Sequence, residues 1–261
     1  MSEALWVQRA PARAEVRLRL FCFPFAGAAA STFREWPNGL PADVELCAVQ
    51  LPGRETRMRE APLVRMDEMV ASLADGLRGL LDQPFAFFGH SMGAFIAFEL
   101  ARELRRSGAR GPSHLVVSAA RAPHRPSSRR PLYALPEAQF VDELGGMNGT
   151  APEVFAHPEL RQLVLRILRA DCALCETWVY RPEAPLDCDI TVLGGLQDRE
   201  VDRDQLEAWR ELTTGACTLR MVPGDHFFIR SARPQVLALV AASLGRVPSG
   251  RGAEPLFFSR R

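Results

Sequence analysis

The segment Phe85-Ala86-Phe87-Phe88-Gly89-His90-Ser91-Met92-Gly93-Ala94 decides the fold. A short apolar run over 85–88 predicts a strand, and apolar residues at helical spacing predict a helix over 94–104. Between them stands a G-x-S-x-G pattern, whose glycines let strand and helix approach each other closely. Such a turn exposes the Ser91 hydroxyl beside a helix N-terminus, which favours a developing negative charge. The segment predicts a nucleophile elbow; the alternative is an ordinary turn between strand and helix.

Strand and helix patterns alternate on both sides of this elbow. Strands are expected over 16–23, 44–50, 114–119, 189–194 and 217–222, and helices over 66–81 and 234–244. From the second strand onward, this alternation indicates a mostly parallel sheet with helices on both faces, an α/β fold.

The alternation breaks between residues 122 and 185. Connectors rich in Pro, Arg and Ser join helical patterns near 136–145 and 158–178, and no strand pattern occurs. We therefore expect an α/β-hydrolase core over 16–121 and 186–246, a helical lid insertion over 122–185, and flexible termini over 1–15 and 247–261.

Composition excludes several classes of function. The 32 basic and 31 acidic residues leave a net charge of +1, so nothing favours nucleic acid or an anionic membrane surface as a partner. Every basic residue is arginine, which excludes a lysine Schiff base, a Walker-A lysine and a Ser-Lys dyad. No apolar stretch reaches about 18 residues, and no signal-peptide pattern opens the chain. We expect a cytoplasmic protein whose six cysteines stay reduced.

A serine nucleophile needs a base, and the chain offers five histidines. His90 adjoins Ser91, where neighbouring side chains diverge. His114 begins a strand, and His124 and His157 lie beside prolines in the expected lid. His226 remains: it follows a strand, precedes the last helix, and comes last in the order Ser, acid, His that this fold uses.

The acid should lie in a loop after the strand that precedes the histidine. Asp198 follows the strand over 189–194 and a glycine break, so it is the candidate that would orient His226. Glu200, Asp202 and Asp204 compete, but they are typical of the start of a helix. Asp225 adjoins His226 and is expected not to reach back to it.

The oxyanion hole needs two backbone N–H donors. Met92, which follows the nucleophile, should supply one. The other should come from the loop after the first strand, with Ala26 preferred, Phe25 next, and a simple tight turn as the alternative.

These segments together resemble the type II thioesterases of polyketide and nonribosomal peptide biosynthesis, within the α/β-hydrolase superfamily. The resemblance runs from about residue 17 to 245. The matching segments are Leu20-Phe21-Cys22-Phe23-Pro24-Phe25-Ala26-Gly27, Phe33-Arg34-Glu35-Trp36-Pro37, Val49-Gln50-Leu51-Pro52-Gly53-Arg54-Glu55, Gly89-His90-Ser91-Met92-Gly93-Ala94, Leu168-Arg169-Ala170-Asp171, Gly194-Gly195 with Asp198, and Gly224-Asp225-His226-Phe227-Phe228. Ala28-Ala29 departs from the family, which commonly has further glycine there.

The resemblance implies hydrolysis of acyl thioesters from the phosphopantetheine arm of acyl or peptidyl carrier proteins, an editing role that clears stalled or misprimed chains. It implies no cofactor and no metal, since the substrate itself carries the phosphopantetheine. The insertion over 122–185 would shape the acyl pocket. Arg121, Arg125, Arg129 and Arg130 would either meet an acidic carrier protein or form a solvated surface.

Two alternatives share the same fold. A carboxylesterase or lipase acting on small esters would use the same triad, and an inactive hydrolase-fold protein would only bind its ligand. The C-x-x-C spacing of Cys172 and Cys175 lies in a helical pattern without further metal ligands, which disfavours a redox or zinc site. No G-x-G-x-x-G follows the first strand, which disfavours a dinucleotide cofactor.

Overall fold

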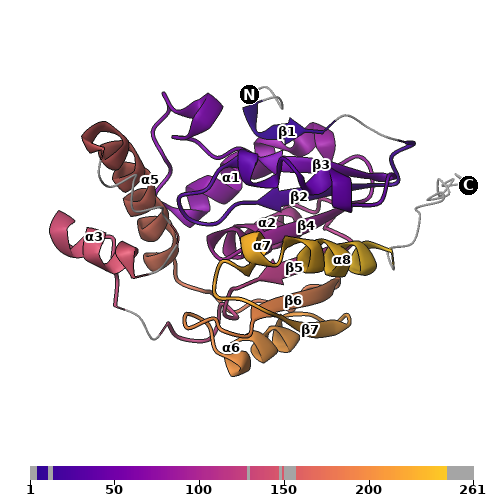
Figure 1. Ribbon diagram of the computed structural model, residues 1–261. Coiled ribbons are helices and arrows are strands. Elements are labelled where there is room, and N and C mark those ends of the chain that lie inside the picture. The colour runs from indigo at the N-terminus through magenta and orange to yellow at the C-terminus, as the bar shows by residue number, and fades with distance from the viewer. Residues whose placement is uncertain (1–4, 11–13, 128–129, 147–148, 150–156, 246–261) are drawn as a thin grey trace, which may run out of the picture.

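A computed structural model describes residues 5–10, 14–127, 130–146, 149 and 157–245. The described chain forms a seven-stranded sheet in the order β1-β3-β2-β4-β5-β6-β7, in which only β1 runs antiparallel (Figure 1). The strands are β1 (Val7–Arg9), β2 (Leu18–Phe23), β3 (Val44–Val49), β4 (Phe85–His90), β5 (His114–Ser118), β6 (Asp189–Gly195) and β7 (Cys217–Val222). The expected α/β-hydrolase fold is confirmed.

The place where the strand order reverses lies between β2 and β4. These strands are hydrogen-bonded neighbours, with Phe21 opposite Phe87. The chain leaves β2 for β3 on one side and β4 for β5 on the other. In open α/β sheets, ligands bind beyond the carboxyl ends of the strands at such a reversal. The loop after β2 and the elbow after β4 both lie at this point.

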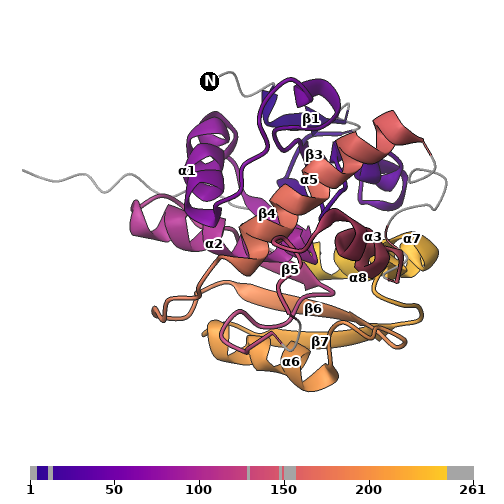
Figure 2. The same ribbon diagram turned by 90° about the vertical axis from the view of Figure 1, so that its left-hand side faces the viewer.

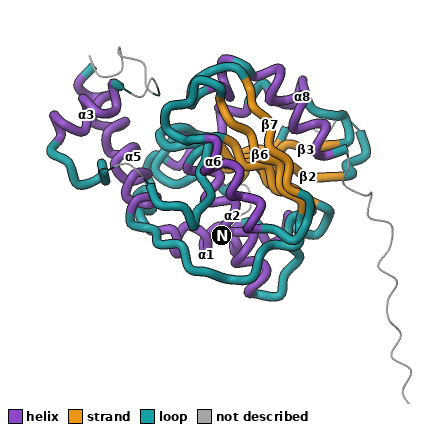
Figure 3. The backbone as a smooth tube through the Cα atoms, turned by 90° about the horizontal axis from the view of Figure 1, so that it is seen from below, coloured by secondary structure: helices purple, strands orange, loops and turns teal. Residues whose placement is uncertain are grey.

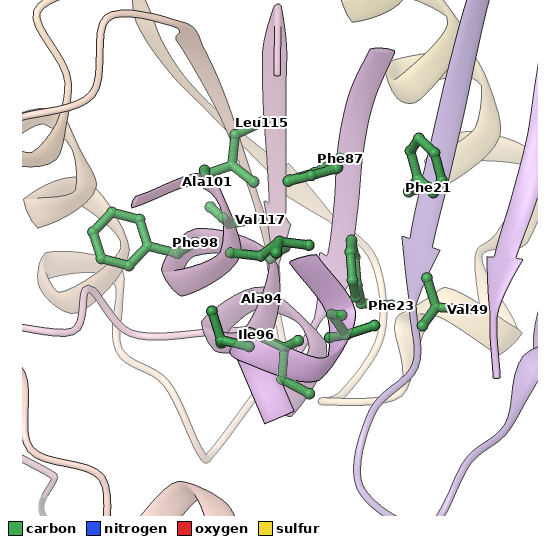
Figure 4. Close-up of a cluster of buried hydrophobic side chains, with 14 of the residues drawn as sticks. Phe21, Phe23, Val49, Phe87, Ala94, Ile96, Phe98, Ala101, Leu115 and Val117 are labelled. Atoms are coloured by element: carbon green, nitrogen blue, oxygen red, sulfur yellow. The ribbon is translucent and has the colours of Figure 1, made fainter. Parts of the chain in front are cut away.

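Helices cover both faces of the sheet. One face carries α1 (Met66–Gly76), α2 (Met92–Arg106) and α6 (Arg203–Glu207), and the other carries α7 (Phe228–Ser231) and α8 (Arg233–Leu244). Strand side chains alternate between the two cores, so Phe21 and Phe23 face α2 while Leu20 and Cys22 face α8. Figure 4 shows the first core, where strand side chains such as Phe23 meet Ala94 and Ile96 of α2.

Two helices between β5 and β6 stand apart from these layers. They are α3 (Glu137–Gly145) and α5 (Pro158–Glu176), and both lie at one side of the sheet (Figures 2 and 3). They share a small core in which Phe140 and Leu144 of α3 pack on Leu165 and Leu168 of α5. Leu174, near the C-terminal end of α5, is fully buried in the core that holds α2, so this end of the helix packs on the main domain.

The beginning of the chain differs from the flexible terminus expected over 1–15. Residues Val7–Arg9 form β1, pairing with β3 so that Val7 lies opposite Val49. Trp6 is 1% exposed and packs in the α1–α2 core. The three-residue strand is too short to show a period in the sequence, which explains the wrong expectation for this part. Residues 247–261 lie outside the described part of the chain.

Candidate active site

Ser91 stands between β4 and α2 in a strained conformation. Its φ is 52° and its ψ is −118°, in a region that non-glycine residues rarely adopt. The Ser91 N–H donates to the Ser118 carbonyl oxygen at 2.8 Å, which ties the turn to β5. A Cβ on Gly93 would overlap the Phe23 carbonyl, and one on Gly89 would overlap the Gly93 carbonyl. The expected elbow is therefore present, with backbone filling the space beside each glycine.

His226 lies between Ser91 and Asp198. Its Nε2 is 3.0 Å from Ser91 Oγ, and its Nδ1 is 3.0 Å from Asp198 Oδ2. The Asp198 carboxylate, 1% exposed, can only accept, so Nδ1 carries the proton and Nε2 is left to accept from the Ser91 hydroxyl. The Glu200 N–H holds the other carboxylate oxygen at 2.8 Å. The three residues singled out from the sequence thus meet in one hydrogen-bonded chain.

The competing acids have other contacts. Asp202 begins α6 as its N-cap and forms a capping box with Gln205. Asp225 accepts from the Phe227 N–H at 2.9 Å. Glu200 lines the cavity beside Ser91.

Three other histidines do not line the cavity beside Ser91. His114, on β5, is 2.9 Å from the Thr191 hydroxyl in the sheet interior. His124 Nε2 lies 3.1 Å from a carboxylate oxygen of Glu211. His157 is the residue that precedes α5.

His90 contacts the His226 loop, a role that sequence reasoning missed. Its ring is fully buried, with Nε2 2.9 Å from the His226 carbonyl oxygen and Nδ1 2.9 Å from Ser118 Oγ. A carbonyl can only accept, so Nε2 carries the proton and Nδ1 accepts from the Ser118 hydroxyl. Burial, followed by the charge of His226, holds the pKa of His90 well below its usual value. His90 is therefore neutral and holds the His226 backbone. The two residues are 136 positions apart in the chain, so no local sequence pattern indicates this contact.

The loop after β2 provides the second wall of the site. A turn runs from Phe25 to Ala28, closed by a 3.0 Å bond from the Ala28 N–H to the Phe25 carbonyl, with Gly27 at φ +79°. The Ala26 N–H is not used by this turn bond. The Met92 N–H belongs to the first turn of α2, which leaves it without an intrahelical partner. Ala26 and Met92 line one cavity with Ser91.

This cavity has a volume of about 230 Å³. Ser91, Ala26 and His226 form part of its wall. Apolar side chains from α2, α3, α5 and the segment before α3 form much of the rest: Met92, Phe95, Leu132, Leu144 and Leu168. The shape and lining suit an apolar chain attached to a group that reacts at Ser91.

The profile described as the thioesterase domain matches residues 18–244. The chain belongs to the thioesterase family. Gramicidin S biosynthesis protein GrsT from Aneurinibacillus migulanus is 41% identical over 239 residues, which cover 92% of the present chain and 93% of GrsT. The structure of YbtT, a type II thioesterase from the yersiniabactin NRPS/PKS pathway, has a TM-score of 0.83 and 32% identity, and the match covers 93% of this thioesterase and 99% of YbtT. The enzyme is thus a thioester hydrolase of the type II class found in these pathways.

Another relative carries a different name. Linear gramicidin dehydrogenase LgrE from Brevibacillus parabrevis is 40% identical over 247 residues, covering 94% of each chain. A dinucleotide fingerprint needs G-x-G-x-x-G after the first parallel strand, and this thioesterase has Phe23-Pro24-Phe25-Ala26-Gly27 at the end of β2 instead. The sequence of the present chain therefore follows the hydrolase pattern and not the dehydrogenase pattern.

Metal and thiol chemistry are the other possibilities that the sequence raised. No cluster of three His, Cys, Asp or Glu residues that could hold a metal is found among the described residues. The C-x-x-C pair lies within α5, and burial raises the pKa of the Cys175 thiol well above its usual value. Thiols in this state react slowly.

None of the helices described is both long and apolar enough to cross a membrane.

Proposed function

We propose that this thioesterase hydrolyses acyl groups from the phosphopantetheine arm of carrier proteins, with Ser91 as nucleophile, His226 as base and Asp198 as the acid that orients the base. The observation that carries the proposal is the position of His226, 3.0 Å from both Ser91 Oγ and Asp198 Oδ2 at the wall of an apolar cavity.

Acylation is the first half of the reaction. Ser91 Oγ attacks the thioester carbonyl carbon while His226 Nε2 takes the hydroxyl proton. The N–H groups of Met92 and Ala26 stabilise the oxyanion of the tetrahedral intermediate. The carbon–sulfur bond then breaks, and the His226 imidazolium returns the proton to the leaving pantetheine sulfur. The products are an acyl-Ser91 ester and a free thiol on the carrier.

Hydrolysis of the ester completes the cycle. Water attacks the acyl carbon while His226 Nε2 takes its proton, and the same two N–H groups hold the second oxyanion. The intermediate collapses to the carboxylic acid, and His226 protonates Ser91 Oγ as it leaves. Every proton is carried by His226, so the proposal needs no cofactor or metal beyond the phosphopantetheine that the substrate brings.

The segment over 122–185 is proposed to act as the lid that shapes the acyl pocket. In support, Leu132, Leu144 of α3 and Leu168 of α5 line the cavity that holds Ser91. An acyl chain would leave water for this apolar wall, which favours its binding.

The proposed contact with a carrier protein is not based on the four arginines named from the sequence, because the structure gives three of them partners within this chain. Arg125 pairs with Glu211, and Arg130 pairs with Glu143. Arg121 donates to carbonyl oxygens, including that of Pro123 at 3.2 Å. Arg129 lies outside the described residues. The proposal places the reaction in the cytoplasm, a compartment in which free thiols such as those of the six cysteines stay reduced.

The test is to load an acyl carrier protein with a short acyl-phosphopantetheine and to follow its intact mass with the wild-type enzyme and with Ser91→Ala. Loss of the acyl mass with the wild type alone is expected. An unchanged acyl mass together with rapid cleavage of a simple ester would indicate a carboxylesterase. Failure of a fluorophosphonate to label Ser91 would indicate a binding protein without activity.

A further inference from the structure

Two motifs of the sequence meet in a buried ion pair. Arg54, in the Pro52-Gly53-Arg54-Glu55 segment, and Asp171, on α5, are 117 residues apart in the chain. Arg54 Nη1 lies 2.8 Å from Asp171 Oδ2, and Nη2 lies 2.7 Å from Oδ1, a bidentate arrangement. Their side chains are 3% and 0% exposed. Neither residue belongs to the triad, so the position of the pair needs its own explanation.

Both members of the pair also bind the turn that holds Ala26. The Gly27 N–H donates to Asp171 Oδ2 at 2.8 Å, and Arg54 Nη1 donates to the Ala28 carbonyl oxygen at 3.0 Å. The turn bond between Ala28 and Phe25 leaves the central peptide, Ala26–Gly27, free to rotate by about 180° between two common turn types. Asp171 accepts from the N–H of this central peptide and so selects one of its two orientations.

Helix α5 fixes the same peptide by packing. A Cβ on Gly27 would lie 2.6 Å from Leu168 Cδ2, so the helix surface closes directly on the turn. Leu168 and Asp171 are three residues apart and lie on one face of α5. One face therefore supplies both the apolar contact and the hydrogen-bond acceptor for Gly27.

We propose that Arg54 and Asp171 are positioning residues for the oxyanion hole. They hold the turn so that the Ala26 N–H stays at the cavity wall shared with Ser91 and Met92. The Ala26 N–H belongs to the peptide before the central one, so the pair holds this donor by fixing the position of the whole turn through the Gly27 N–H and the Ala28 carbonyl oxygen. This inference rests on the proposed function, in which Ala26 supplies one of the two oxyanion donors.

The first test variant is Asp171→Asn. The amide keeps the shape of the side chain, but its NH₂ group must face a donor in either orientation: Arg54 Nη2 in one, and Arg54 Nη1 with the Gly27 N–H in the other, so the buried pair is broken and the hold on the turn is weakened. In single-turnover hydrolysis of the acyl-loaded carrier protein, we expect the acylation rate to fall at least about tenfold, because the loss or displacement of an oxyanion donor is costly. KM should stay within about twofold, and the pH midpoint of the rate should not move, since the change leaves His226 alone.

A matched control separates positioning from loss of stability. Glu45 is also buried in an ion pair, with Arg19 at 3.0 Å, but it lies on β3 opposite Arg19 of β2, and it has no contact with the Phe25–Ala28 turn among those described. Glu45→Gln should lower the thermal midpoint while leaving the acylation rate within about twofold at temperatures where both variants are folded. An equal rate loss in Glu45→Gln would overturn the proposal, as would an unchanged rate in Asp171→Asn.

A double variant gives a second, independent test. Replacing a buried ion pair with apolar side chains of similar size often preserves stability. Arg54→Met with Asp171→Leu should therefore have a thermal midpoint above that of the single variant Asp171→Leu. Its acylation rate should remain at least about tenfold low, because nothing then accepts from the Gly27 N–H. Recovery of the rate in the double variant would overturn the proposal. Hydrolysis retained by Ser91→Ala would instead refute the proposed function, so the two failures are distinguishable.

Discussion

The Nε2 of His90 donates a hydrogen bond to the carbonyl oxygen of His226, 2.9 Å away. The residue before Ser91 therefore holds the backbone of the residue whose ring contacts the Ser91 hydroxyl. Edge-to-face packing adds to this contact, since the two rings lie 5.6 Å apart at 60°. His90 is buried as a neutral ring, so the arrangement depends on pH.

We expect stability to fall as the solution becomes acidic, in part because of His90. Its pKa lies well below the ordinary value of about 6.5 in the folded protein and returns to it on unfolding. Above pH ~6.5 the contribution of His90 is fully present, because both states hold the neutral ring. Below that pH the unfolded state binds a proton that the folded state does not. The free energy of unfolding should then decrease by up to ~1.4 kcal/mol per pH unit until the folded-state pKa is reached.

Chemical denaturation of the wild type and of His90→Gln between pH 5.5 and pH 7.5 measures this effect. Gln keeps a donor and an acceptor but does not titrate. The variant should be less stable at pH 7.5, and its free energy of unfolding should change less with pH. Parallel pH dependence in the two proteins would show that His90 does not titrate on unfolding.

Asp198→Asn tests the acid of the triad. An amide at this position would no longer accept from Nδ1 with a full charge and would favour the wrong tautomer of His226, so kcat should fall roughly a thousandfold or more. Glu200→Gln is the comparison variant, because the substitution keeps the backbone N–H of Glu200, which donates to Asp198 at 2.8 Å. Steady-state hydrolysis of the same acyl carrier protein compares the two. A large loss in Glu200→Gln with activity retained in Asp198→Asn would reassign the acid.

Gly93→Ala tests the packing of the elbow. The added Cβ would overlap the carbonyl oxygen of Phe23, a backbone atom that cannot rotate away, so α2 and β2 would have to separate. We expect a loss of at least ~2 kcal/mol in stability and of most activity. Gly111→Ala adds the same methyl group where no atom lies within 4 Å, and it should change stability by less than ~0.5 kcal/mol. Equal thermal midpoints for the two variants would contradict this account of the elbow.

Trp6→Ala tests whether the chain before β2 is part of the core. Trp6 is 1% exposed, and the Arg57 guanidinium lies 4.0 Å from the centre of its ring. Removing the indole should cost ~3–5 kcal/mol, measured by chemical denaturation. Leu5→Ala, at a residue 46% exposed, should cost less than ~0.5 kcal/mol. A Trp6→Ala protein as stable as the wild type would show that the beginning of the chain is dispensable for the fold.

Local patterns in the sequence predict much of this architecture. The G-x-S-x-G pattern is complete within five residues, so Ser91 and its flanking strand and helix can be predicted from sequence, although α2 begins at Met92 instead of 94. His226 and Asp198 follow from chain order on a known fold. The distances that join them to Ser91 come only from the structure.

Features that depend on pairing between distant segments are not readable in this way. β1 is stabilised by β3, some forty residues later, and its three residues carry no period of their own. The contact of Asp171 with Gly27 spans 144 residues. The sequence resemblance includes the segments that contain Gly27 and Asp171, but it does not show that the two residues are in contact; the structure does.

The bond between Asp171 and Gly27 also orders events during synthesis. A ribosome that adds about 5–20 residues per second needs on the order of ten seconds to pass from Gly27 to Asp171. For the later part of that interval Ser91 has been added to the chain, while the turn at Gly27 still lacks its acceptor. The nascent chain therefore carries the Ser91 hydroxyl before the turn beside it has its acceptor, and under the proposed mechanism hydrolysis must wait longer still, until Asp198 and His226 have been added after α5.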